Sequence, residues 1–239
     1  EKTMPLIPLK IPAGVYRNGT EYQSAGRYYD SNLVRWFEGT LRPLGGWRKK
    51  SESQMTGSCR GLITWRDNSA DRWIAAGTHS KLYAMNEAGT LKDITPTTFT
   101  AGIADAATKT GYGYSTYGSY AFGVARPDNG SVTPATTWTM DTWGEYLVAC
   151  SDADGKLYEW QLGFSTPTIA AAITNAPTSC AAVMTTAERF VFALGASGNP
   201  RLVKWCDQEN NTVWTASTTN QAGDFELQTV GSLKCGKRV

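Results

Sequence analysis

The chain has 239 residues, of which 18% are charged, and its net charge at pH 7 is +2. This length predicts one large β domain or two small ones, with a core large enough to need neither disulfides nor a structural metal. Because 23 Lys and Arg are nearly balanced by 21 Asp and Glu, the overall charge gives no indication of a nucleic-acid-binding protein. The 9 Trp and 11 Tyr, with abundant Thr and Gly, favour strands and turns over helices.

The charge is unevenly distributed along the chain. Residues 1–60 hold ten Lys and Arg against five Asp and Glu, whereas residues 97–200 hold four against eight. This asymmetry suits electrostatic docking between neighbouring subunits, although an ordinary solvated surface gives the same pattern.

The five cysteines are widely spaced, and no Cys-x-x-Cys pair occurs among Cys59, Cys150, Cys180, Cys206 and Cys235. An odd number at such spacings favours reduced, buried thiols in a protein assembled in the cytosol over a secreted disulfide framework. No apolar run of about 18 residues predicts a membrane span, and the first residues lack the layout of a signal peptide. Because the last residues follow a strand-like patch without a terminal signal, we expect the sequence to be part of a longer chain.

Four sections follow one another along the chain. Residues 1–20 carry three prolines, which block helix and ladder hydrogen bonds, and they predict an extended N-terminal arm. Residues 21–96 are rich in aromatics and short alternating runs. Residues 97–137 are rich in Gly, Tyr, Thr and Ala and predict an inserted loop, and residues 138–239 return to strands and turns.

Three segments share one order of residue types: a charged residue, an aromatic, aliphatic and small residues, a polar turn, Lys or Arg, and then Leu. These segments are residues 72–85, 145–160 and 189–205. Each predicts a β-hairpin, because turn-forming residues separate two apolar runs. The pattern makes Leu82, Leu157 and Leu202 equivalent, at spacings of 75 and 45 residues.

The repeated hairpin predicts the architecture. The strand that follows each aromatic (Trp73, Tyr146 and Phe190) is nearly all apolar, so we expect both of its faces to be covered. Inner strands of propeller blades have this character, and the spacing of 45 residues matches one blade. We therefore expect an all-β, β-propeller-like domain over residues 21–239, with residues 97–137 inserted and the arm in front. The alternative is a β-sandwich or barrel.

Candidate catalytic and metal-binding residues are few. His79 is the single histidine and lies in a predicted turn, where a neighbouring Ser80 is poorly placed to act as its nucleophile. The Asp152-x-Asp154-Gly155 run resembles the opening of a calcium loop, but Gly163 stands where that loop needs its closing Glu. A hairpin turn explains the run better.

Other chemical signals are equally weak. Two carboxyl pairs, Asp141 with Glu145 and Asp224 with Glu226, are candidates for glycoside hydrolysis, but nothing in the sequence singles them out. No glycine-rich phosphate loop occurs. The basic cluster at residues 48–50 fits a solvated loop or a subunit contact better than a phosphate backbone. We therefore expect no enzymatic activity, no cofactor and no bound metal.

The segment after the arm resembles a phage virion protein. It reads Asn-x-Val-Arg-Trp at residues 32–36 and Gly-x-x-Arg-Pro-x-Gly-Gly-Trp at residues 39–47. A short arm, this segment and propeller-like hairpins together are similar to the tail nozzle (hub) proteins of short-tailed bacteriophages, a group that includes packaged-DNA stabilisation proteins. Members of this family are usually considerably longer than 239 residues.

The resemblance implies a structural virion protein of the tail, assembled in the host cytoplasm. Such proteins form a ring, commonly a hexamer, below the portal and adaptor rings, prolong the channel that double-stranded DNA crosses, and offer attachment surface to tail fibres or spikes. The alternative is a receptor- or glycan-binding propeller at the virion tail.

An assembly role directs attention to the residues that neighbouring subunits would contact. Tyr gives a large contact area at low entropic cost, so the Gly/Tyr-rich loop is one candidate, and the arm with its following segment is the other. The expected assembly contacts are Arg17, Arg35, Trp36, Arg42, Trp47, Tyr112, Tyr114, Tyr117 and Tyr120. The alternative interpretation of the Gly/Tyr-rich loop is a mobile surface segment without assembly contacts. The acidic balance of residues 97–200 leads to the hypothesis that this part lines the DNA channel.

Overall fold

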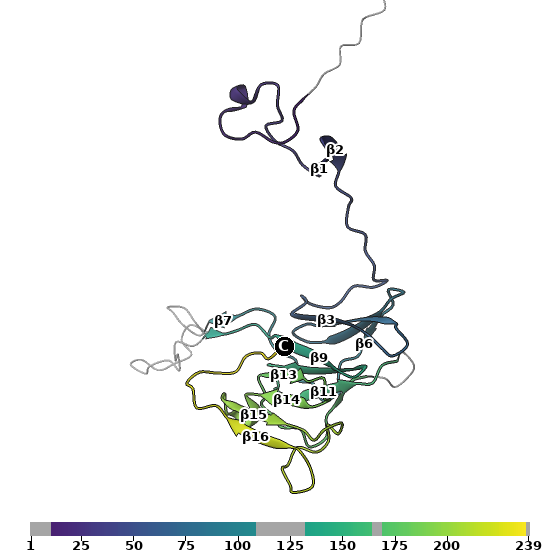
Figure 1. The fold of residues 1–239 in the computed structure, drawn as a ribbon, viewed down its shortest axis with the longest axis vertical. Helices are drawn as coiled ribbons and strands as arrows, with labels where there is room; N and C mark the ends of the chain where they lie inside the picture. Colours follow the sequence, from purple (N-terminus) through teal and green to yellow (C-terminus); the bar gives the residue numbers. More distant parts are fainter. Residues whose placement is uncertain (1–10, 109–131, 164–168, 238–239) are drawn as a thin grey trace, which may run out of the picture. The chain divides into compact units, whose positions relative to one another are not determined.

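The computed structural model describes residues 11–108, 132–163 and 169–237 (Figure 1). The chain divides into two compact units, residues 1–49 and residues 50–239, so the boundary expected at residue 20 lies inside the first unit. Over the described residues the fold is all-β, as the composition predicts, and none of the sheets closes into a barrel. No helix in this part of the chain is long and apolar enough to cross a membrane.

The first unit is built around a small β-hairpin. Its elements are the 3-10 turn η1 (Glu21–Ser24) and the strands β1 (Val34–Phe37) and β2 (Thr40–Pro43). The two strands pair antiparallel and are joined by Glu38 and Gly39, whose φ angles are 49° and 73°. Two-residue hairpin turns with positive φ at both positions match the twist of the flanking strands.

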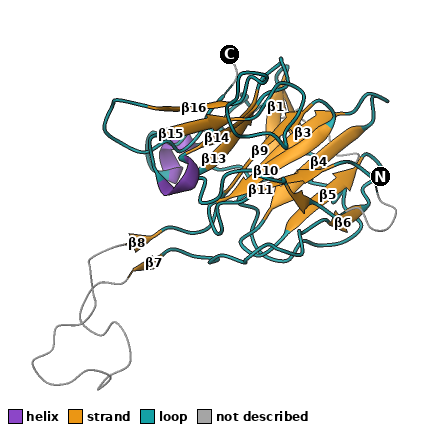
Figure 2. Ribbon diagram, turned by 90° about the horizontal axis from the view of Figure 1, so that it is seen from below, coloured by secondary structure: helices purple, strands orange, loops and turns teal. Residues whose placement is uncertain are grey.

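The second unit contains three four-stranded antiparallel sheets, each made of consecutive strands (Figure 2). The first sheet comprises β3 (Gly61–Arg66), β4 (Arg72–Gly77), β5 (Leu82–Asn86) and β6 (Leu91–Asp93). The second comprises β9 (Trp138–Trp143), β10 (Tyr146–Ser151), β11 (Leu157–Trp160) and β12 (Ala171–Ala172). The third comprises β13 (Ala182–Thr185), β14 (Val191–Leu194), β15 (Leu202–Trp205) and β16 (Gly223–Glu226).

Three further elements lie between these sheets or within their turns. The short strands β7 (Ala107–Thr108) and β8 (Val132–Thr133) pair with each other between the first and second sheets. The 3-10 turn η2 (Ala196–Gly198) lies between β14 and β15.

The three hairpins predicted from the repeated pattern are confirmed. Residues 72–85 form β4 and β5, residues 145–160 form β10 and β11, and residues 189–205 contain β14 and β15. In each case a further strand on either side completes the four-stranded sheet.

The expected equivalence of the three leucines is wrong for the third sheet. Leu82 pairs with Gly77 and Leu157 pairs with Cys150, each four positions after the aromatic of its hairpin. In the third sheet Val203 holds the corresponding place, because it pairs with Leu194. Leu202 is one position earlier and therefore points to the opposite face of its sheet. The turn between β14 and β15 is longer than the turns of the other two hairpins. Aligning the three segments by the Lys or Arg followed by Leu therefore places Leu202 one residue out of register.

The second sheet lies between the other two and buries both of its faces. One core lies between the first and second sheets and is formed by Trp73, Ala75, Leu82, Trp138, Leu147, Ala149, Tyr158 and Trp160, among others. A second core lies between the second and third sheets and includes Trp143, Val148, Cys150, Leu157, Val183, Val191 and Ala193. Successive residues of β10 thus enter different cores. The prediction that the strand after the aromatic is covered on both faces is confirmed for β10.

The first strands of the sheets, β3, β9 and β13, lie next to one another in chain order. Side chains of β9 hydrogen-bond to the backbone of β13: Asp141 Oδ2 accepts from Thr185 N at 2.8 Å, and Thr139 Oγ1 accepts from Val183 N at 3.0 Å. Contacts between consecutive sheets therefore include directional hydrogen bonds as well as apolar packing.

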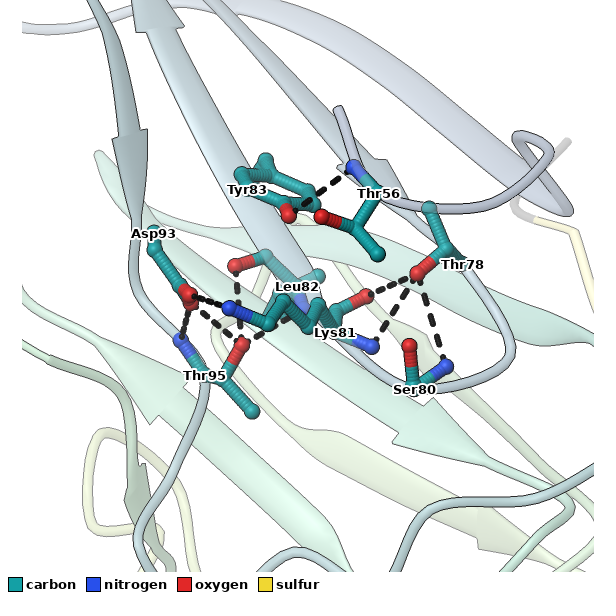
Figure 3. Close-up of polar contacts among 8 residues, drawn as sticks. All are labelled: Thr56, Thr78, Ser80, Lys81, Leu82, Tyr83, Asp93 and Thr95. Carbon is teal, nitrogen blue, oxygen red and sulfur yellow. Dashed lines mark hydrogen bonds and ion pairs between the residues drawn. The ribbon is translucent and has the colours of Figure 1, made fainter. Parts of the chain in front are cut away.

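A network of polar contacts holds the β4–β5 turn and the start of β5 (Figure 3). Thr78 Oγ1 accepts from the backbone N–H of Lys81 at 3.1 Å, and Lys81 Nζ lies 2.7 Å from Asp93 Oδ2. Thr95 Oγ1 accepts from the Leu82 N–H at 2.9 Å. The Lys81–Asp93 pair ties the third strand of the sheet to the fourth.

Candidate functional site

The candidate assembly residues described by the structure all lie in the first unit. Arg17 pairs with Asp30 at 3.3 Å, and its guanidinium lies 5.7 Å from the ring centre of Tyr29. Arg35 and Arg42 face each other across the β1–β2 ladder. Like charges directly opposite on a ladder repel, so this hairpin presents a positive face that an acidic partner would stabilise.

The two tryptophans of this unit differ in their surroundings. Trp36 packs on Tyr28 with ring centres 5.1 Å apart, and its buried Nε1–H finds no acceptor among the described residues. Trp47 is fully exposed. A free indole of this size is a large apolar surface left in water, and interfaces are enriched in such side chains.

The first unit has almost no interior of its own. Among residues 11–49 only Ser24 is buried. A two-stranded hairpin without a covered apolar face is only marginally stable in water. The unit is therefore suited to gain its order from another surface, which agrees with an assembly role for its side chains.

The four tyrosines predicted to make assembly contacts, Tyr112, Tyr114, Tyr117 and Tyr120, lie outside the described residues.

The sheets of the second unit share a pattern of apolar positions. We call the face that a sheet turns toward the preceding sheet its leading face. In the second sheet this face carries Leu147 and Ala149, both 1% exposed, and in the third sheet it carries Val191 and Ala193, both fully buried. Each pair stands one and three positions after the hairpin aromatic.

The first sheet has the same leading face without a described sheet in front of it. Ile74 and Ala76 stand one and three positions after Trp73, and Ala76 pairs with Leu62. The residues that pair with the equivalent alanines are Met140 and Val183, and both pack into an inter-sheet core. Leu62, in contrast, is 64% exposed. Ala76 itself is buried, and its cross-strand neighbour Tyr83 accepts from the Thr56 N–H at 3.1 Å, so the chain before β3 covers part of this face. By register, the part that is left exposed, at Leu62, is suited to pack against another apolar group.

Tryptophan side chains connect consecutive sheets. Trp65 Nε1 donates to the carbonyl of Glu145 at 3.0 Å, and Trp143 Nε1 donates to the carbonyl of Arg189 at 2.7 Å. Both acceptors directly precede the hairpin aromatic of the next sheet. The equivalent residue of the first sheet is Arg72.

A surface hollow of about 350 Å³ lies at this equivalent place. It is lined by Thr64, Trp65, Arg66, Arg72, Trp73 and Ile74. These residues are the end of β3 and the start of β4, where the leading face of the first sheet meets the Arg72 carbonyl.

The opposite end of the stack, the far face of the third sheet, is also apolar. Phe192 stacks on Trp205 with ring centres 5.8 Å apart, and Phe225 is 55% exposed. Gly236 lies against Met184 and Leu194 on the same face. The stack thus ends in apolar surface on both sides, of which the C-terminal segment covers only a part.

The residues considered for catalysis or metal binding have structural partners. Asp141 binds backbone of β13, and Glu145 accepts from the Asn68 N–H at 3.2 Å. Asp152 accepts from the Thr137 N–H and hydroxyl, and Asp154 accepts from the Tyr158 hydroxyl at 2.6 Å. No cluster of three potential metal ligands occurs over the described ranges.

The remaining candidates are equally ordinary in their surroundings. His79 is half-buried in the β4–β5 turn, with its ring beside Gly57. Glu226 pairs with Arg201, and Asp224 is exposed.

All five thiols are free; three are buried, as expected from the sequence, but the expectation is wrong for Cys59 and Cys235, which are exposed. Burial raises the pKa of Cys150 well above its ordinary value, raises that of Cys180 to about 12, and raises that of Cys206. Such thiols stay protonated at neutral pH and behave as small apolar side chains.

A scan against protein-family models, a search of curated proteins and a search of solved structures each returned no match.

Sequence reasoning missed the hydrogen bonds between sheets. Trp65 and Glu145 are 80 positions apart, and nothing in the local pattern of either residue indicates the other. One signal was present: Trp65 and Trp143 each stand shortly before a repeated hairpin, at the end of a first strand.

Proposed function

We propose that the chain is a structural subunit of the tail nozzle (hub) ring of a short-tailed bacteriophage, and that its three sheets act as β-propeller-like blades. Four-stranded meanders stacked face to face in chain order, with their first strands adjacent, are the units from which propellers are built. The resemblance of residues 32–36 and 39–47 to nozzle proteins supports the choice of assembly.

The observation that carries the proposal is the shared leading face of the three sheets. A stack of like sheets that ends in apolar surface on both sides is a rigid scaffold made to be extended by further contacts. Structural rings need such scaffolds, and the first unit, with its exposed Trp47 and facing Arg35 and Arg42, supplies side chains for contacts to neighbours.

In this proposal the subunits form a ring, taken as a hexamer, that continues the DNA channel below the portal and adaptor proteins. Its outer surface receives tail fibres or spikes. The chain has no enzymatic role and takes no cofactor, and it is assembled in the host cytoplasm and located in the virion tail.

Electron microscopy of the purified protein and of virions labelled on this chain tests the proposal. We expect a closed ring centred on the channel axis, between the adaptor and the tail tip. Label at the periphery of the tail, as a monomer or trimer, would contradict a nozzle and favour an adhesin.

A receptor- or glycan-binding module is the second candidate, and one observation favours it. A hollow of about 360 Å³ is lined by Glu159, by residues in and around β12, and by Asn211 and Thr212 between β15 and β16. Carboxylate and amide side chains in such a hollow are polar groups that can orient a ligand. Binding of host-surface glycans to the purified protein, lost on Glu159→Ala, would support this function.

A further inference from the structure

The first sheet has a hollow at the place that a tryptophan side chain fills in the other two sheets. In the second and third sheets the place in front of the hairpin aromatic is filled by an indole, which donates to the carbonyl of Glu145 or of Arg189. In the first sheet the equivalent place is the hollow beside Arg72, of about 350 Å³. The hollow is mostly apolar in its lining, so an aromatic ring with one N–H donor fits its chemistry.

The third sheet of another copy does not supply this group. Thr186 pairs with Phe190 in the third sheet, as Trp65 pairs with Trp73 and Trp143 with Tyr146 in the others. A threonine cannot fill a hollow of indole size. The far face of that sheet is also partly covered by Gly236, which lies against Met184 and Leu194.

Trp47 is the described tryptophan that is free to fill the hollow. It is fully exposed, whereas Trp36 packs on Tyr28. Gly45 and Gly46 precede Trp47, and no other atoms lie close to either glycine. A segment without side chains allows close approach to a sheet surface, so the indole can be delivered from an extended strand.

Charge favours the same pairing. Residues 1–49 hold eight Lys and Arg against four Asp and Glu, which leaves fifteen against seventeen in residues 50–239. The hollow itself is lined by Arg66 and Arg72, and Arg72 is paired with Glu87 at 3.9 Å, so the attraction comes from the opposite net charges of the two units. Complementary charge of this kind steers association and fixes its register.

From these observations we infer that Trp47 of one copy inserts into the hollow on the first sheet of a second copy and donates its Nε1–H to the carbonyl of Arg72. Each copy offers one indole and one hollow on different surfaces, so the contact is head-to-tail. Contacts of that type close into rings when the rotation between copies permits it. The inference rests on the proposed ring function and names the contact that joins neighbouring subunits.

Self-association of the full chain tests the inference. Sedimentation velocity over a range of concentrations at low salt should show concentration-dependent oligomers. Trp47→Ala should raise the dissociation constant at least about thirtyfold, which corresponds to a hot-spot loss of about 2 kcal/mol. Tyr22→Ala is the matched control, because Tyr22 is an exposed aromatic of the same unit at 93% exposure, and it should leave association unchanged.

Blocking the hollow is the complementary experiment. Thr64→Arg fills it from an exposed strand position and should weaken association to the same extent without unfolding the sheet, as circular dichroism would verify. Mixing the Trp47→Ala and Thr64→Arg proteins should restore one intact contact per pair. The mixture should therefore form heterodimers that grow no further.

Three results would overturn the inference. They are a wild-type chain that is monomeric at all concentrations, a Trp47→Ala or Thr64→Arg protein that associates as strongly as the wild type, and a mixture that forms no heterodimer. Virions that show a nozzle ring while Trp47→Ala leaves that ring intact would reject this contact and keep the proposed function.

Discussion

The Trp143 indole makes two contacts with Arg189, a hydrogen bond and a cation–π contact. Its Nε1 donates to the Arg189 carbonyl at 2.7 Å, and the Arg189 guanidinium lies 4.5 Å from the centre of its ring. Arg189 has a φ of 67°, a conformation that few non-glycine residues adopt, and this places its carbonyl and side chain on the same neighbour. The junction between the second and third sheets is thus fixed by a direct contact between one residue of each.

Replacing this indole tests how much the junction contributes to stability. Trp143→Phe keeps an aromatic ring but removes the indole donor to the Arg189 carbonyl, which still accepts from the Glu209 N–H at 3.3 Å, so the free energy of unfolding should fall by about 0.5–1.5 kcal/mol. Trp143→Ala also leaves a cavity and should cost about 3–5 kcal/mol. Urea unfolding curves measure both. Trp47→Phe, in dilute protein, is the control, and an equal loss there would refute a specific role for the junction.

The tight approach of Trp138 to the first sheet leaves no room for a side chain at Gly77. A Cβ on Gly77 would overlap the Trp138 ring, which also donates to the Thr78 carbonyl at 2.6 Å. Overpacking of this kind costs about 1–3 kcal/mol, so we expect Gly77→Ala to lower the melting temperature. Gly46→Ala meets open space and should change it little. A Gly77→Ala protein as stable as the wild type would show that the first and second sheets can separate enough to admit a methyl group at no cost in stability.

The Lys81–Asp93 pair predicts a pH dependence. Burial raises the pKa of Asp93, but hydrogen bonds from Lys81 and Thr95 together lower it by more, and the hydrogen bond to Asp93 raises the pKa of Lys81. The Asp93 contribution is therefore present above about pH 4, the unfolded value, and is lost as pH falls through its folded pKa. The Lys81 contribution is lost as pH rises through a folded pKa above its ordinary value.

Asp93→Asn should accordingly lower the melting temperature by a few degrees at pH 7, and by less at pH 2 or above pH 11. Thermal melts of wild type and variant across pH measure the difference. If the difference in melting temperature between wild type and variant stays constant over the whole pH range, Asp93 acts through packing and hydrogen bonding alone, independent of its charge.

Thiol reactivity separates the two classes of cysteine. Cys59 and Cys235 are exposed and should react rapidly with an aromatic disulfide reagent at pH 8. Burial raises the pKa of Cys150, Cys180 and Cys206, so the thiolate fraction of these thiols is very small and they should react only after unfolding. Mass spectrometry of the labelled peptides identifies the modified sites. Fast labelling of Cys180 in native protein would disprove the packing between the second and third sheets.

Local pattern predicted the strands well because hairpins are local. The pairing of two strands in a hairpin depends on about fifteen residues: an aromatic, an apolar run and a turn rich in Gly, Asp or Asn. The β10–β11 hairpin lies where the sequence has this pattern. The coverage of both faces of β10 also followed from its composition, since a strand without polar positions cannot face water.

The register of the third sheet and the contacts between sheets could not be predicted from the local sequence pattern. Leu202 and Val203 exchange roles because the β14–β15 turn is longer, and a shift of one residue moves a side chain to the other face. The assembly residues of the first unit were chosen by resemblance, and the structure adds that Trp47 is exposed while Trp36 is packed. The hollow at Arg72 was not predicted, because it depends on how two strands end together.

Strand order within the sheets has a consequence for how such a protein changes over evolutionary time. Every strand of the three sheets pairs only with strands next to it in the chain, and no strand is exchanged between sheets. Duplication or loss of the DNA that encodes one whole sheet would therefore leave all other pairings intact. The new neighbours would meet through the same alternation of an aliphatic residue and alanine on the leading face. Relatives of this chain are thus free to differ in their number of sheets while keeping the apolar part of the junction.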